Sequence, residues 1–244
     1  MRKSIRNLLL GASAAAVVAA ASVGILSLHR TPVDPQEVLE SLEFAPDSAE
    51  AYFNLGVAEF RRGHKPEAMK CWLRTAELEP DNYEAHHNLA LALEEQGNLD
   101  QAIEHYRRAA QLKPDDGLTQ AQFGTALCAK GAIQEGLAQL SNAVSLDPAN
   151  NAVRYSLATT LARLKQHDQA IAHFLRILRL DPRNADALVG LAASYAETGQ
   201  VGKALGCLEE VLRIAQSSGN QKLIEQITKR IDLYRQREPA GRSG

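Results

Sequence analysis

Aromatic side chains are scarce in this chain of 244 residues: Phe, Tyr and Trp together make up 5% of it, with a single tryptophan. A core with so few rings has to be built from Ala, Leu and Ile at close backbone approach, which favours packed helices. The 45% apolar and 23% charged composition excludes a disordered acidic or basic chain, and 16 glycines and 9 prolines exclude a collagen-like or proline-rich polymer. The composition therefore predicts a folded, helical protein.

Cysteine is also rare. Cys71, Cys128 and Cys207 are odd in number, widely separated, and not part of any Cys-x-x-Cys pair. This spacing indicates neither a disulfide framework nor a zinc site. We expect three free thiols in the core or in a groove.

Motifs that carry chemistry are missing as well. The sequence contains no glycine-rich phosphate loop, no Gly-x-Ser-x-Gly and no His-Glu-x-x-His. The adjacent His86 and His87 would diverge by about 100° on a helix, which suits a shared metal ion poorly, and His167 and His173 fall in a turn and in a second helix. We predict a protein that is not an enzyme, with no catalytic residue, no metal site, no cofactor and no small-molecule substrate.

Basic residues are in excess only at the N-terminus. Residues 1–30 contain Arg2, Lys3, Arg6 and Arg30 and no acid, so residues 31–244 carry 23 basic and 29 acidic side chains. An acidic body is unsuited to neutralising phosphates, which argues against nucleic acid as a partner.

The uncharged stretch of residues 8–28 follows the first three basic residues and has the length that a helix needs to cross a bilayer. Acidic residues follow it, so we expect a cytoplasmic N-terminus, with the rest of the chain outside the cytoplasm and periplasmic in a Gram-negative cell. The leading interpretation is a retained membrane anchor formed by residues 1–30. A cleaved signal peptide, with its site at Ala19-Ala20-Ala21, and an organelle presequence are the alternatives.

Prolines mark a period of 34 residues. They stand at Pro46, Pro80, Pro114, Pro148 and Pro182. Two residues after each proline is a side chain suited to cap a helix N-terminus, namely Ser48, Asn82, Asp116, Asn150 and Asn184. Further along each unit is a glycine suited to end a helix, except in the fourth unit; these residues are Gly63, Gly97, Gly131, Lys165 and Gly199. Each unit is therefore predicted to be a helical hairpin.

Periodic columns indicate how the hairpins pack. One column is large and apolar: Leu55, Leu89, Phe123, Leu157 and Leu191. The next residue in each unit is small: Gly56, Ala90, Gly124, Ala158 and Ala192. The second helix has another small column: Ala68, Ala102, Gly136, Ala170 and Ala204. Four residues later come large side chains: Trp72, Tyr106, Leu140, Phe174 and Leu208. An aliphatic column should close each unit: Leu78, Leu112, Leu146, Leu180 and Ile214. One hairpin cannot bury all of these, so stability should come from stacking neighbours.

These columns resemble the tetratricopeptide repeat (TPR) family. The first unit has Tyr52-x-x-Leu55-Gly56, then Ala68-x-x-x-Trp72 and Pro80, and the resemblance covers five units. Glu59 departs from the aromatic or aliphatic residue usual there, and Gly136 replaces the usual alanine, so we expect the third unit to be the loosest. The resemblance implies an all-α fold, a right-handed solenoid of five hairpins.

The predicted organisation assigns each segment a role. Residues 31–45 are a linker and a capping half-repeat, residues 46–215 are the five-repeat domain, residues 216–237 are an amphipathic C-terminal capping helix, and residues 238–244 are a disordered tail.

In the TPR family the first helices line a concave groove that binds peptides. Transferred position by position, these inner-face residues are Glu50, Phe53, Asn54, Val57, Phe60, Arg61, Glu84, His87, Asn88, Leu91, Glu94, Glu95, Leu118, Ala121, Gln122, Thr125, Cys128, Ala152, Tyr155, Ser156, Thr159, Arg163, Asp186, Val189, Ala193 and Glu197. The apolar residues among them are expected to face water, which marks contact sites; they are Phe53, Val57, Phe60, Leu91, Leu118, Tyr155 and Val189.

The residues that bind the acidic tails of heat-shock chaperones in some TPR proteins are absent here, except for Asn88. The mixture of apolar and acidic residues instead suggests a protein or peptide ligand with apolar anchors and a few basic residues. We therefore expect a membrane-tethered scaffold outside the cytoplasm. A soluble periplasmic adaptor, or a regulatory module of an envelope enzyme complex such as a glycosyltransferase or a cell-wall hydrolase, are the alternatives.

Overall fold

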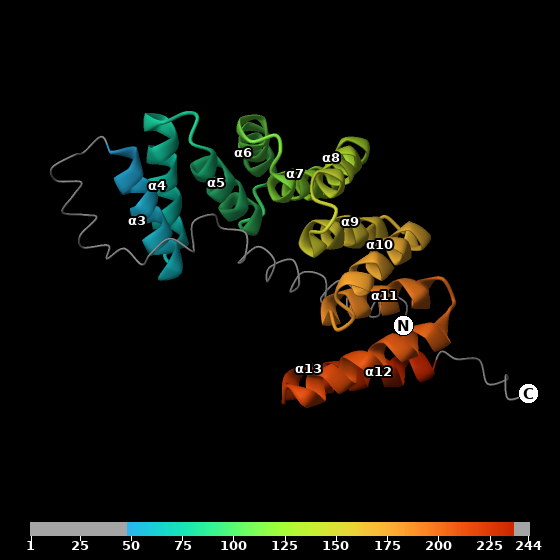
Figure 1. Ribbon diagram of the computed structural model, residues 1–244. Coiled ribbons are helices and arrows are strands. Elements are labelled where there is room, and N and C mark those ends of the chain that lie inside the picture. The colour runs from blue at the N-terminus through green and yellow to red at the C-terminus, as the bar shows by residue number, and fades with distance from the viewer. Residues whose placement is uncertain (1–47, 237–244) are drawn as a thin grey trace, which may run out of the picture. The chain divides into compact units, whose positions relative to one another are not determined.

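The computed structural model describes residues 48–236 of the chain (Figure 1). Within this range it contains eleven helices and no strand, which confirms the all-α class. The predicted membrane segment 8–28, the half-repeat within residues 31–45 and the tail 238–244 lie outside the described residues. Within residues 48–236, no helix combines the length and the apolar character needed to cross a bilayer.

The helices belong to two units, with the boundary between Leu146 and Asp147. The first unit has three helical pairs: α3 (Ala49–Arg61) with α4 (Lys65–Leu78), α5 (Tyr83–Glu95) with α6 (Leu99–Leu112), and α7 (Gly117–Lys130) with α8 (Ile133–Leu146). The second unit has two pairs and one further helix: α9 (Asn151–Arg163) with α10 (His167–Leu180), α11 (Ala185–Glu197) with α12 (Val201–Ser217), and then α13 (Gln221–Arg235). The five pairs correspond to the five predicted hairpins.

Each first helix begins at the capping residue that the sequence indicates. The side-chain oxygens of Ser48, Asn82, Asp116, Asn150 and Asn184 each accept a hydrogen bond from a backbone N–H in the first turn. These bonds satisfy donors that have no partner inside the helix. The five predicted helix starts are therefore confirmed.

The turns inside the hairpins also follow the sequence. Gly63, Gly97, Gly131 and Gly199 all have positive φ, and Lys165 adopts φ 62° at the equivalent position of the fourth hairpin. A side chain with a Cβ is strained in this region by roughly 1–2 kcal/mol. The hairpin geometry is thus kept in the fourth repeat even where glycine is missing.

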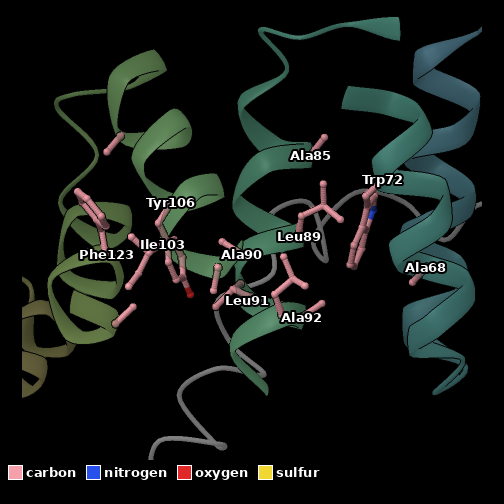
Figure 2. Close-up of a cluster of buried hydrophobic side chains, with 14 of the residues drawn as sticks. Ala68, Trp72, Ala85, Leu89, Ala90, Leu91, Ala92, Ile103, Tyr106 and Phe123 are labelled. Atoms are coloured by element: carbon pink, nitrogen blue, oxygen red, sulfur yellow. The ribbon is translucent and has the colours of Figure 1, made fainter. Parts of the chain in front are cut away.

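The packing columns form the core (Figure 2). The large residues of the second helices, Trp72, Tyr106, Leu140, Phe174 and Leu208, are all fully buried. In Figure 2, Trp72 of α4 and Leu89 of α5 point toward each other, and Tyr106 lies on the other side of α5 near Ala90. The closing aliphatic column differs from expectation, because Leu146 is 42% and Leu180 is 51% exposed. These two residues end their helices on the surface instead of sealing the hairpin.

The third hairpin is not loose; its two helices come very close together. A Cβ built on Gly136 of α8 would lie 2.6 Å from the Gly124 carbonyl oxygen and 2.9 Å from the Cys128 backbone nitrogen on α7. Two glycines facing each other remove both Cβ atoms and allow backbone contact. The expectation that Gly136 loosens this unit is therefore wrong.

The C-terminal helix starts later than expected. Gln216 and Ser217 extend α12, and a turn with Gly219 at φ 66° precedes α13. Ile227 and Ile231 of α13 are buried in a cluster with residues of α11 and α12, while its Lys and Arg side chains lie on the other face. A helix with one apolar and one polar face is typical of the end of a repeat array.

We predict that Gly136→Ala destabilises the protein although it restores the alanine of the other repeats. The new methyl group meets backbone atoms that cannot move independently, and such overpacking costs about 1–3 kcal/mol. The midpoint of urea unfolding should fall. Gly206→Ala in α12 is the matched control: its Cβ meets nothing within 4 Å, so its higher helix propensity should stabilise the protein by up to about 1 kcal/mol. A Gly136→Ala midpoint at or above that of the parent protein would contradict the close contact.

Candidate functional site

Several predicted inner-face residues are not accessible. Six of them are buried: Phe53, Val57, His87, Asn88, Leu91 and Ala121. The expectation that Phe53, Val57 and Leu91 face water is wrong, because these side chains join the core cluster that includes Trp72 and Leu89. These three residues, which the family resemblance assigns to the groove, instead pack in the core of the first unit.

The other predicted residues keep access to solvent. Exposed ones are Glu50, Arg61, Ala152, Arg163, Asp186 and Glu197. Half-buried ones are Asn54, Phe60, Glu84, Glu94, Glu95, Leu118, Gln122, Thr125, Cys128, Tyr155, Ser156, Thr159, Val189 and Ala193. Of the seven apolar candidates, four thus remain at the surface: Phe60, Leu118, Tyr155 and Val189.

A buried polar network explains why His87 is in the core. Its Nδ1 lies 2.7 Å from the Thr119 hydroxyl oxygen on α7, and that oxygen is 2.8 Å from the Tyr83 hydroxyl. Tyr83 donates to the Asp116 carboxylate at 2.6 Å. Burial alone would raise the pKa of Asp116, but hydrogen bonds from Thr119 and Tyr83 lower it overall. The network joins α5 to the start of α7, and the sequence alone did not reveal it.

The acidic residues of α5 are held by partners on other helices. Lys65 donates to Glu95 at 2.6 Å, and Lys113 lies 3.6 Å from Glu84. The hydroxyl of the buried Tyr106 donates to Glu94 at 2.7 Å. The pKa of Tyr106 is raised, mainly by burial and to a smaller extent by the negative charge of Glu94. These contacts fix three carboxylates along one helix of the first unit.

In the second unit the accessible candidates gather on α9 and α11, which contact each other. Tyr155 packs edge-on against Phe174, with the ring centroids 5.9 Å apart. Burial, together with the negative charge of Asp186, raises the pKa of Tyr155 to about 12. Val189 is half-buried on α11, and the exposed Arg163 lies at the end of α9. This surface offers two apolar side chains, with the Asp186 carboxylate close enough to Tyr155 to affect its pKa.

A second feature that sequence reasoning missed lies at the start of three first helices, α5, α7 and α9. His86, Gln120 and Arg154 occupy one repeat position, and each side chain contacts the backbone carbonyl of the proline six residues before it. His86 also faces His105 of α6, with the two Nδ1 atoms 2.9 Å apart. Burial lowers the pKa of both rings, that of His105 to about 4.

Metal-ligating side chains do not gather into larger clusters in the described part of the chain. Among residues 48–236, no three His, Cys, Asp or Glu side chains converge in a way that could hold a metal ion. Burial and the nearby Glu59 and Glu67 raise the pKa of Cys71 to about 11, and burial also raises that of Cys207. A raised pKa keeps a thiol protonated and poorly nucleophilic.

We predict that Phe53→Ala destabilises the protein by about 3–5 kcal/mol, because truncating a buried phenylalanine leaves a cavity. Phe60→Ala, seven residues along the same helix, is the control. Phe60 is only half-buried, although its ring lies 5.8 Å from that of Trp72, so the loss should be smaller. Chemical denaturation of both variants measures the difference, and equal losses would show that Phe53 is no more buried than Phe60.

Four models described as tetratricopeptide repeat match residues 49–82, 83–116, 122–185 and 161–227. No curated protein matches the chain.

Solved structures share the fold. YrrB, described as a TPR protein with an unusual peptide-binding site, is 20% identical, with a TM-score of 0.60 over 80% of this chain and 100% of that one. TTC0263, a thermophilic TPR protein of Thermus thermophilus, is 20% identical, with a TM-score of 0.61 over 75% of this chain and 98% of that one. MamA (41-end) from Desulfovibrio magneticus RS-1 is 21% identical, with a TM-score of 0.62 over 69% and 96% of the two chains.

Proposed function

The chain belongs to the tetratricopeptide-repeat family, and from this premise we propose that it is a non-enzymatic scaffold that binds a protein or peptide through the accessible inner-face residues. The family and the fold support a role in protein–protein interaction. YrrB, which shares the fold, is described as having a peptide-binding site, and we extend peptide binding to this chain.

The observation that carries the proposal is the accessible surface of α9 and α11 in the second unit. Tyr155 and Val189 are half-buried there, although the packing columns of the same helices are buried. Tyrosine offers a large apolar contact together with a hydrogen-bonding group, and such residues dominate the energy of many interfaces. We assign the apolar anchor of the ligand to this surface.

The charges favour a particular kind of ligand. Asp186 and Glu197 lie exposed on α11, and Arg163 is exposed at the end of α9. In the first unit the half-buried Glu84, Glu94 and Glu95 follow one face of α5. A peptide with an apolar side chain and at least one basic residue would complement either surface.

We predict that charge reversal on this surface impairs ligand binding. Peptides would be selected from a phage-displayed library against the full chain, and their affinity measured by fluorescence anisotropy. Asp186→Lys should weaken binding of the selected peptides at least several-fold, because the basic residue of the ligand would then meet a positive charge close to Tyr155. A few anchors suffice for micromolar binding, which requires about 8 kcal/mol.

Asp168→Lys is the matched control. Asp168 is likewise an exposed aspartate in the first turn of a helix, but it lies on the second helix α10. Both substitutions place a positive charge in the first turn of a helix, where its interaction with the helix dipole is unfavourable by about 0.3–1 kcal/mol. If Asp168→Lys weakened binding as much as Asp186→Lys, or if no peptide were selected, the assignment to the first helices would be wrong.

We further propose, from the sequence of residues 1–30, that a retained N-terminal helix tethers the scaffold to a membrane with its repeats outside the cytoplasm. The support is the uncharged stretch 8–28 after three basic residues. Produced in a bacterial host, the full chain should remain in the membrane fraction after alkaline carbonate washing and keep residues 1–21. A mature N-terminus near residue 22 would show cleavage and a soluble adaptor instead.

A further inference from the structure

His86 of α5 and His105 of α6 form a pair that the proposed scaffold function does not use. Their Nδ1 atoms are 2.9 Å apart and their ring centroids 5.2 Å apart. The residues are 19 positions apart in sequence and meet only because the second hairpin folds back on itself. Both rings are half-buried in the first unit.

The surroundings determine which nitrogen of His86 carries its proton. His86 Nε2 lies 3.0 Å from the carbonyl oxygen of Pro80, which can only accept, so Nε2 donates. In the neutral ring, Nδ1 of His86 is then an acceptor, and Nδ1 of His105 donates to it. A histidine that donates one ring N–H to a backbone carbonyl, with the lone pair of the other nitrogen aimed at a partner, has the arrangement typical of a metal ligand.

We propose that His86 and His105 bind one divalent transition-metal ion, Zn²⁺ or Cu²⁺, between their Nδ1 atoms. Two nitrogens at the usual zinc distance of about 2.0–2.1 Å lie roughly 3.3 Å apart in tetrahedral geometry. The Nδ1–Nδ1 distance therefore has to grow by only a few tenths of an ångström, and each ring has to turn so that its Nδ1 lone pair points at the ion. On binding, the proton of His105 moves from Nδ1 to Nε2, and both rings remain neutral ligands. Water molecules supply the remaining ligands.

The neighbouring charges set the strength of the site. Arg108 of α6 would repel a cation, but its guanidinium is paired with the Asp81 carboxylate and its Nε lies 3.5 Å from the Pro80 carbonyl. Asp81 therefore compensates the charge of Arg108 beside His86. With two protein ligands, the ion would bridge α5 and α6 and stabilise the folded hairpin increasingly as the free ion concentration exceeds the Kd of the site.

The test is isothermal titration of the full, untagged chain with zinc chloride. We expect one ion to bind per chain, and His86→Gln and His105→Gln each to weaken binding by about tenfold or more. His64→Gln is the matched control: His64 is exposed and its ring bonds to Glu59, so binding should be unchanged. Far-UV circular dichroism confirms that each variant remains helical.

A spectroscopic measurement on the unmodified chain avoids any dependence on folding of the variants. With one equivalent of Cu²⁺, electron paramagnetic resonance should show hyperfine coupling to two imidazole nitrogens. The proposal is overturned if zinc shows no binding below millimolar concentration, if affinity survives both substitutions in folded protein, or if the copper spectrum lacks nitrogen coupling.

Discussion

Close contact between the two helices of each hairpin is the constraint on which the structure depends. It requires a small residue on each helix where they cross, and the chain supplies one at the same two positions of every repeat. The large side chains that follow, such as Trp72 and Phe174, fill the space that the small residues leave. Without the small pairs the helices would separate by about the width of a methyl group, and the large residues would no longer reach a close-packed environment.

The same constraint explains the variation between repeats. At the crossing of α7 and α8 both residues are glycine, and the backbones touch. Gly56 instead makes room for the ring of Trp72 in the same hairpin. Gly190 of α11 plays a similar part between hairpins, because the ring of Phe174 on α10 approaches the position that a Cβ would occupy there. Glycine in these helices costs conformational entropy, and the close packing it permits offsets that loss.

Much of the fold could be predicted from the sequence because its signals are local and repeated. Capping side chains such as Asn82 satisfy free N–H groups within a few residues, and the position of Lys165 in the period predicts its turn. The candidate site was harder to predict. Whether Phe53 or Leu91 faces solvent depends on how closely the neighbouring first helix packs, and that distance is set by many side chains together. The contact between His86 and His105 depends on the register of two helices, which no single motif encodes.

The accessible surface of the first helices is the part of the molecule left free by this packing. Binding of the ligand by these inner-face residues is tested most directly by nuclear magnetic resonance of the ¹⁵N-labelled chain titrated with a selected peptide. Amide shift changes should concentrate on α9 and α11 around Tyr155 and Val189. Changes concentrated on α10 and α12, with α9 and α11 unaffected, would contradict this expectation.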